Sequence, residues 1–271
     1  MVSFIFTTIV LFMISSIFPL VSFLLPVYGI REIKKGNMKM NILKNGLVAL
    51  ILLLLNYELL LYYIVIYLGT EMFFLFLENK KIGEYEKIHI TALIFTILIY
   101  GYINMNLAEF NQIMEQTKIL YIDKLHLDEK MMSETINYMK KYVLLIIYIA
   151  LAFMNFMTYM ILKYKSYINW KISYYYLIPY VILFLLEKIY KINNIYIING
   201  IVIFKIPFII YGVKELYKGL KKYMKNKNML TIVLMLLSIF IPDGIFILGG
   251  IRSFKIFEEV FEDESNIEGK C

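Results

Sequence analysis

The chain has 271 residues, of which 61% are hydrophobic and 18% charged, and its mean hydropathy is +0.69. Such a chain has too little polar surface to cover a water-soluble globule of its size, so its solvent must be lipid. The formal charge of +7 lies mainly in lysine-rich stretches between apolar ones. The positive-inside rule explains such loops, and we therefore expect a lipid bilayer and no nucleic acid as partner.

The first predicted span covers residues 2–30, which are almost wholly apolar. The stretch lacks a basic segment before it and a small-residue cleavage site within it, so we expect a retained helix and not a signal peptide. Pro19 and Pro26 lie inside this span. Because proline disrupts a helix interior, the span is predicted to kink or to continue as a short second helix.

Residues 46–78 allow two interpretations. One helix over 46–68 with an interfacial piece gives seven spans, whereas two short helices hinged near Asn56, Tyr57 and Glu58 give eight. The hairpin groups 17 basic residues on one side of the membrane and 10 on the other, a stronger bias than the 15 and 12 of the seven-span alternative. The positive-inside rule therefore favours the hairpin, although helices of about 15 residues are short for a crossing.

Five further apolar stretches approach the length of about 20 residues that crosses a bilayer. They cover residues 88–107, 142–162, 173–187, 195–213 and 229–251. We therefore predict an all-α, polytopic transmembrane helical bundle over residues 1–253, with about seven or eight spans and one amphipathic surface helix. The remaining residues, 254–271, are acidic and are predicted to form a disordered tail.

The polar segment 108–141 is the predicted amphipathic connector. Apolar residues recur in it at helical spacing, opposite charged ones, at Phe110, Ile113, Met114, Thr117, Tyr121 and Leu125, and then at Met132, Ile136 and Met139. This pattern is typical of a helix that lies on the membrane surface or against the bundle. A helix that docks a partner protein is the alternative.

Two charged residues inside the predicted spans are candidates for ligand binding, because such groups are costly in lipid and usually face a bundle interior. Lys205 lies near the middle of its span, beside Pro207. Asp243 follows Pro242, at a discontinuity of the kind that exposes backbone groups in transporters. The alternative is that Lys205 and Asp243 pair as a structural contact inside the bundle.

Three further candidates are weaker. Glu58 is the third charged candidate, although a carboxylate at a hairpin turn needs no functional explanation. Asn155 and Asn199 lie within predicted spans, where hydrogen bonds between helices are the alternative role.

Motifs of catalysis and cofactor binding are missing from the sequence. His89 and His126 stand apart, without the HExxH spacing of a zinc site, and the chain contains no GxxxxGK[ST], GxSxG or GxGxxG. We therefore expect no enzymatic activity, no metal and no cofactor. Any nucleotide hydrolysis would need a partner.

The order of several motifs resembles a known family. The stretches are PLVSFLLPVYGIREIKKGN, LENKK, MNFMTYMILKYK, YYYLIP and IPDGIFILGGIRSFKIF. In this order they are similar to the YybS-like family of predicted bacterial multi-pass membrane proteins. The resemblance implies about seven or eight spans and a distant relationship to the substrate-binding S components of energy-coupling-factor vitamin transporters. The chain departs from the pattern at Arg252 and Ser253, where the family has an acidic residue.

Two functions follow as expectations. The first is a small-molecule binding or transport subunit in the cytoplasmic membrane of a bacterium, energised by a separate ATPase module or an ion gradient. The second is a scaffold or regulator that docks other membrane proteins through segment 108–141 and the basic loops. An enzyme that acts on lipid ranks third, because no nucleophile or metal set is recognisable.

Overall fold

The computed structural model describes residues 1–36, 38–78, 80, 82–163, 171–192, 194–221, 223 and 227–254. These residues form helices and no β-strand, which confirms the all-α class. Their contacts group the chain into two compact units, Met1–Trp170 and Lys171–Cys271. The single bundle over residues 1–253 therefore stays a prediction. The tail, apart from Phe254, lies outside the described residues.

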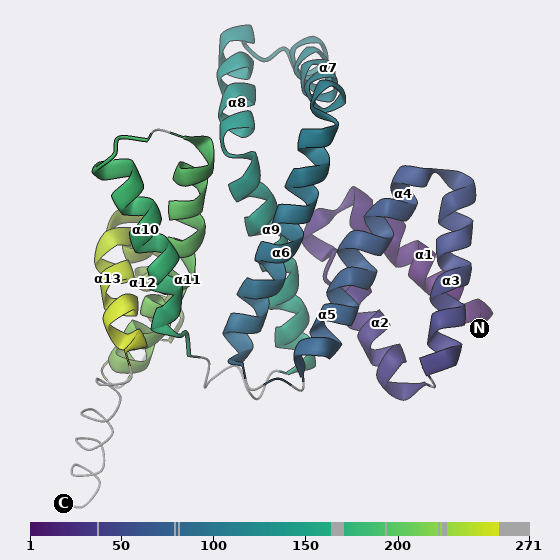
Figure 1. Cartoon of the computed structure of the whole chain (residues 1–271), viewed down its shortest axis with the longest axis horizontal. Helices are drawn as coiled ribbons and strands as arrows, with labels where there is room; N and C mark the ends of the chain where they lie inside the picture. Colours follow the sequence, from purple (N-terminus) through teal and green to yellow (C-terminus); the bar gives the residue numbers. More distant parts are fainter. Residues whose placement is uncertain are drawn as a thin grey trace, which may run out of the picture. The chain divides into compact units, whose positions relative to one another are not determined.

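Unit 1 contains most of the helices (Figure 1). Their bounds are α1 Val2–Ile17, η1 Pro19–Val21, α2 Leu24–Lys35, α3 Met38–Leu55, α4 Tyr57–Tyr62, η2 Tyr63–Leu68, α5 Gly69–Glu78, α6 Glu84–Met105, α7 Leu107–Leu125, α8 Glu129–Lys141 and α9 Val143–Leu162. The helix α1 ends just before Phe18 and Pro19, since a residue before proline disfavours the helical conformation. The chain then continues as α2, the short second helix of the prediction.

Four helices have the length and hydropathy to cross a membrane. They are Tyr57–Glu78, Tyr85–Met105, Val143–Leu162 and Ile195–Leu220. The first of these runs without a break through α4, the π-helical segment η2 and α5. A fifth span is possible if two helices near the end of the described chain count as one. The membrane class thus agrees with the sequence, while the count of seven or eight spans stays a prediction.

The chain breaks at Asn56, where the hairpin interpretation placed the hinge. Asn56 is extended, with φ −166° and ψ 133°, and its side chain accepts a hydrogen bond of 2.6 Å from the backbone N–H of Glu58. This is the ordinary N-cap contact of asparagine, and it starts α4. The two helices have 18 and 22 residues, so the expected shortness was wrong.

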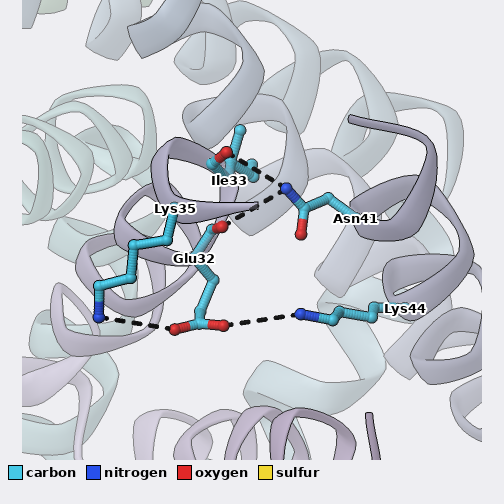
Figure 2. A network of polar contacts seen from close by, with 5 residues as sticks. All are labelled: Glu32, Ile33, Lys35, Asn41 and Lys44. Carbon is cyan, nitrogen blue, oxygen red and sulfur yellow. Dashed lines mark hydrogen bonds and ion pairs between the residues drawn. The ribbon is translucent and has the colours of Figure 1, made fainter. Parts of the chain in front are cut away.

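Polar contacts close the turn between α2 and α3 (Figure 2). The Asn41 side chain donates to the carbonyls of Glu32, at 3.4 Å, and Ile33, at 3.3 Å, near the carboxyl end of α2. The Glu32 carboxylate lies between Lys35 and Lys44, at 3.9 and 3.7 Å. The capped carbonyls and the ion pairs fix this basic turn.

The ends of three helices in unit 1 meet, with two lysines beside one carboxylate. Glu78, the last residue of α5, lies 2.7 Å from the Nζ atom of Lys34 on α2 and 3.3 Å from that of Lys163 after α9. The ends of α2, α5 and α9 therefore lie on the same side of the unit, as the hairpin interpretation requires.

The connector forms two helices in place of one. The helices α7 and α8 lie beyond the ends of α6 and α9 as an antiparallel hairpin (Figure 1). The turn contains His126 in the left-handed region, with φ 53°, and the Asp128 side chain caps α8. Ion pairs between the helices join Lys118 to Glu129 and Lys140 to Glu115, each at 3.8 Å.

Unit 2 consists of η4 Tyr174–Tyr176, α10 Leu177–Lys188, α11 Ile195–Leu220, α12 Lys227–Phe240 and α13 Pro242–Ser253. The helices α11 and α13 approach each other at two glycines. A Cβ atom on Gly249 would lie 2.0 Å from the carbonyl oxygen of Phe208, and one on Gly212 would lie 2.3 Å from that of Ile245. Only glycine permits such an approach of the two backbones.

The predicted last span, residues 229–251, is broken at the expected discontinuity. The helices α12 and α13 meet at an angle of 105°, and Pro242 begins α13. Proline fits the first turn of a helix but not its interior, so the break falls where Pro242 stands. The geometry is that of a broken span or a re-entrant loop.

Candidate functional site

Two of the five candidate residues meet in unit 2. The Nζ atom of Lys205, on α11, donates to the Oδ1 atom of Asp243 in the first turn of α13. Lys205 also lies over the ring of Phe246, 5.8 Å from its centroid. The Asp243 side chain is 78% exposed, so the predicted pair exists but lies at the surface of the unit and not in its interior.

The two asparagine candidates lie in different units and have different surroundings. Asn199 is buried on α11 and donates to the carbonyl of Ile195 one turn earlier, at 2.7 Å, which is a contact within its own helix. Asn155 on α9 is 0% exposed. Neither its Oδ1 nor its Nδ2 atom has a hydrogen-bond partner in the described part of the chain. A buried amide without partners is costly, which sets Asn155 apart.

Glu58 lines a groove of about 580 Å³ in unit 1. The groove lies between the α4–η2 helix on one side and α6 with the start of α7 on the other. Most of its wall is apolar, with Leu59, Tyr62 and Ile66 on one side. Leu98 and Tyr102 face them from α6. The sequence candidate is therefore part of a long apolar cleft.

The polar groups of the groove gather at one end. Glu58 stands at the start of α4, and Asn106 and Glu109 stand at the junction of α6 and α7. Because the α4–α5 helix and α6 are consecutive and antiparallel, the start of the first and the end of the second lie at the same level. The Asn106 side chain donates to the carbonyl of Tyr102, at 3.0 Å, and so covers the helix end.

The two carboxylates of this end lack counter-charges. Within the described ranges, neither Glu58 nor Glu109 forms an ion pair, and both are exposed. Both lie in the first turn of a helix, where the helix dipole favours a negative charge. The groove therefore combines an apolar wall with an acidic end.

Sequence reasoning missed Glu109 and a second acid, Glu71. Glu71 lies on α5 in the middle of a long apolar run and is 2% exposed. Its position inside a predicted apolar stretch was the signal that could have identified it. Glu109 gave no such signal, since an acid in a polar connector is ordinary. Glu109 lies near Glu58 only in the folded chain, where α6 returns to the level at which α4 begins.

Among the residues that the structure describes, no group of three or more His, Cys, Asp or Glu side chains could hold a metal ion. Comparison with protein-family models, curated proteins and solved structures found no match to this chain. The resemblance to the YybS-like family therefore stays a prediction.

Proposed function

We propose that the chain is an integral membrane protein that binds a small amphiphile with a cationic head in the groove of unit 1. The observation that carries this proposal is the apolar cleft with Glu58 and Glu109 together at one end. A volume of about 580 Å³ lies within the range of small-molecule sites, which is about 300 to 1,000 Å³. An alkyl chain would lie along the apolar wall and an ammonium group beside the carboxylates.

Charge supports a cation as the head group. The chain as a whole carries a formal charge of +7, yet both charged residues that line the groove are acids. Two carboxylates that form no ion pair within the described ranges repel an anionic head and attract an ammonium or guanidinium. Binding is thus expected to select the head group by charge and the tail by length.

The proposal includes a setting in the membrane. The hairpin at Asn56, with the basic turns that meet at Glu78, favours eight spans with the 31–44 and 79–87 loops on the cytoplasmic side of a bacterial inner membrane. As a binding or transport subunit, resembling an S component, the protein would need an ATPase module or an ion gradient to move its ligand.

A membrane scaffold is the second candidate function, and the α7–α8 hairpin is the observation that favours it. Two of its apolar side chains are exposed: Ile119 by 57% and Leu120 by 50% of the surface. The scaffold function predicts that lysine at these two positions changes the size of the complexes formed in native membranes. Groove variants would leave those complexes unchanged.

Binding to purified protein in phosphatidylcholine nanodiscs tests the groove. The probes are dodecyltrimethylammonium and dodecylphosphocholine, which share a tail and differ in net charge. We expect tighter binding of the cation, and Glu58→Gln and Glu109→Gln should each weaken it by up to about fivefold, since an exposed charge pair contributes up to about 1 kcal/mol. Ile99→Trp, which fills the groove, should abolish binding of both probes.

The matched control is Glu134→Gln, which removes an exposed carboxylate on α8 away from the groove. It should leave the affinity for both probes unchanged. Equal affinities of the wild-type protein for the two probes, or an unchanged cation affinity in the double glutamine variant, would contradict the proposal.

A further inference from the structure

Glu71 is a carboxyl group buried in the middle of a membrane-length helix. It lies within Tyr57–Glu78, and 2% of its surface is exposed. Its Oε2 atom has no hydrogen-bond partner among the described residues. An ionisable side chain in such a position is rare in membrane helices and usually has a function.

The backbone of α2 holds the carboxyl group at Gly29. A Cβ atom on residue 29 would lie 2.0 Å from Oε1 and 2.6 Å from Oε2 of Glu71. Both oxygens therefore lie in the space that any other side chain would fill. The contact is close, and it leaves no room on this side for a hydrated ion.

The nearby lysines are engaged at a different carboxylate. Lys34 of α2 and Lys163 after α9 both contact Glu78, which lies two helical turns, or about 10 Å, beyond Glu71. Between these levels stands the buried Phe74, whose ring lies 5.5 and 5.8 Å from the two ammonium groups. An aromatic layer thus separates Glu71 from the basic end of the unit.

A second buried polar side chain lies at the matching position of α9. The contacts Phe74–Tyr159, with centroids 4.4 Å apart, and Glu78–Lys163 show that α5 and α9 run in the same direction here. One turn before this ring contact, α5 carries Glu71 and α9 carries Asn155. The helix α2 packs against both α5 and α9. Asn155 is fully buried, and its amide atoms have no partner in the described ranges.

Several titratable groups lie on the elements packed against α5, among them the buried Tyr67 of η2 and the buried Lys87 of α6. On η2, Tyr63 donates to the Asn45 side chain, at 2.9 Å. On α6, the Nδ1 atom of His89 lies 2.6 Å from the Tyr148 hydroxyl. On α2, Arg31 is exposed, and Glu32 pairs with lysines at the basic turn. Among the described residues, Glu71 forms no ion pair.

An isolated carboxylate in an apolar interior costs so much solvation energy that the group takes up a proton instead. We propose that Glu71 is a proton-binding residue of the membrane interior, neutral while it contacts Gly29 and ionised only when α2 and α5 separate at this contact. A metal ion does not fit the site, since the described residues bring no three acidic, histidine or cysteine ligands together. The inference does not depend on the groove and needs no amphiphile.

The pH dependence of unfolding tests the inference directly. If Glu71 is neutral in the folded protein, unfolding releases its proton, so stability falls as the pH rises. We would measure thermal unfolding of the full chain in detergent from about pH 5 to about pH 9, for wild type and for Glu71→Gln. Relative to the glutamine variant, the wild-type ratio of folded to unfolded protein should fall by up to about tenfold per pH unit.

The control variant Glu134→Gln should follow the wild-type profile, because it removes an exposed carboxylate of α8 and leaves Glu71 in place. Parallel pH profiles for wild type and Glu71→Gln would overturn the inference. A sodium-dependent gain in stability that Glu71→Gln abolishes would also overturn it, because the site would then bind a metal cation and not a proton.

Chemical labelling gives a second readout. Dicyclohexylcarbodiimide reacts with protonated carboxyl groups in apolar surroundings: the proton moves to a carbodiimide nitrogen while the carboxyl oxygen bonds to the central carbon. We expect one adduct, on the peptide that contains Glu71, whose yield falls as the pH rises. No adduct is expected in Glu71→Gln. Labelling that falls on exposed acids and not on Glu71 at the lower pH would contradict the assignment.

Discussion

The two units each use a glycine for a contact closer than any other residue permits, but the partners differ. In unit 2, Gly249 lies against the backbone carbonyl of Phe208. In unit 1, Gly29 lies against the carboxyl group of Glu71. The first contact joins two helices by their backbones, as small residues do in membrane proteins. The second holds a buried polar side chain at a place where an apolar residue of similar size would pack equally well.

The acidic side chains of the two units also differ in their surroundings. Asp243 has a lysine partner and a largely exposed side chain, so structure alone explains it. Glu71 is buried and forms no ion pair among the described residues. The comparison teaches that the candidate for function is Glu71, whose burial no structural contact explains. Asp243, beside the break at Pro242, is not the candidate.

The largest effect is expected at the backbone contact of unit 2. Gly249→Ala places a methyl group 2.0 Å from a carbonyl oxygen that cannot move without shifting α11. We expect the free energy of unfolding to fall by about 3 kcal/mol, the upper end of overpacking costs. Chemical unfolding in detergent would measure it. The control is Gly219→Ala on the same helix pair, where the new methyl group meets no atom within 4 Å and should be neutral or slightly stabilising.

A smaller effect is expected at Gly29, because a side chain can move where a backbone cannot. Gly29→Ala should lower the free energy of unfolding by about 1 to 2 kcal/mol, since the Glu71 carboxyl must leave its position. In a Glu71→Ala background the same change should cost less, which a double-mutant cycle would measure. Gly101→Ala, whose Cβ position is open, is the control. Additive effects of the two substitutions on the free energy of unfolding would show that the contact between Gly29 and Glu71 does not affect stability.

The smallest effect is expected for the ion pair of unit 2. The exposed position of Asp243 limits the coupling between Lys205 and Asp243 to about 1 kcal/mol. Lys205→Met and Asp243→Asn should each lower the free energy of unfolding slightly, and the double variant should lower it by less than the sum of the two, because the pair can be lost only once. Thermal unfolding of the three variants in detergent provides the cycle. A coupling free energy near zero would show that the pair does not contribute to stability.

Local features of the fold could be predicted because local chemistry determines them. Asn56 caps a helix with its own side chain, and Pro242 cannot continue one, so both breaks follow from the residues themselves. The pairing of Lys205 with Asp243 followed from the cost of single charges in lipid. Its exposure did not follow, because it depends on the bend of 105° between α12 and α13.

The candidate sites depend on contacts that no local pattern contains. Glu71 differs from an ordinary mid-span acid only because Gly29, far earlier in the chain, lies against it. Glu58 and Glu109 share a groove only because the α4–α5 helix and α6 are antiparallel. The connector 108–141 was expected as one helix, and its division in two required the left-handed residue His126, which the apolar spacing did not indicate.

The π-helical segment η2 has a consequence for the rotation of the helix that contains it. It occupies Tyr63–Leu68, contains the groove residues Val65 and Ile66, and precedes the buried Glu71. A π turn holds one residue more than an α turn, and one residue corresponds to a rotation of about 100°. The angle between the groove residues before η2 and the Glu71 face thus depends on how many residues η2 contains and on their π-helical conformation. Loss of one residue from η2 would therefore turn Glu71 away from Gly29.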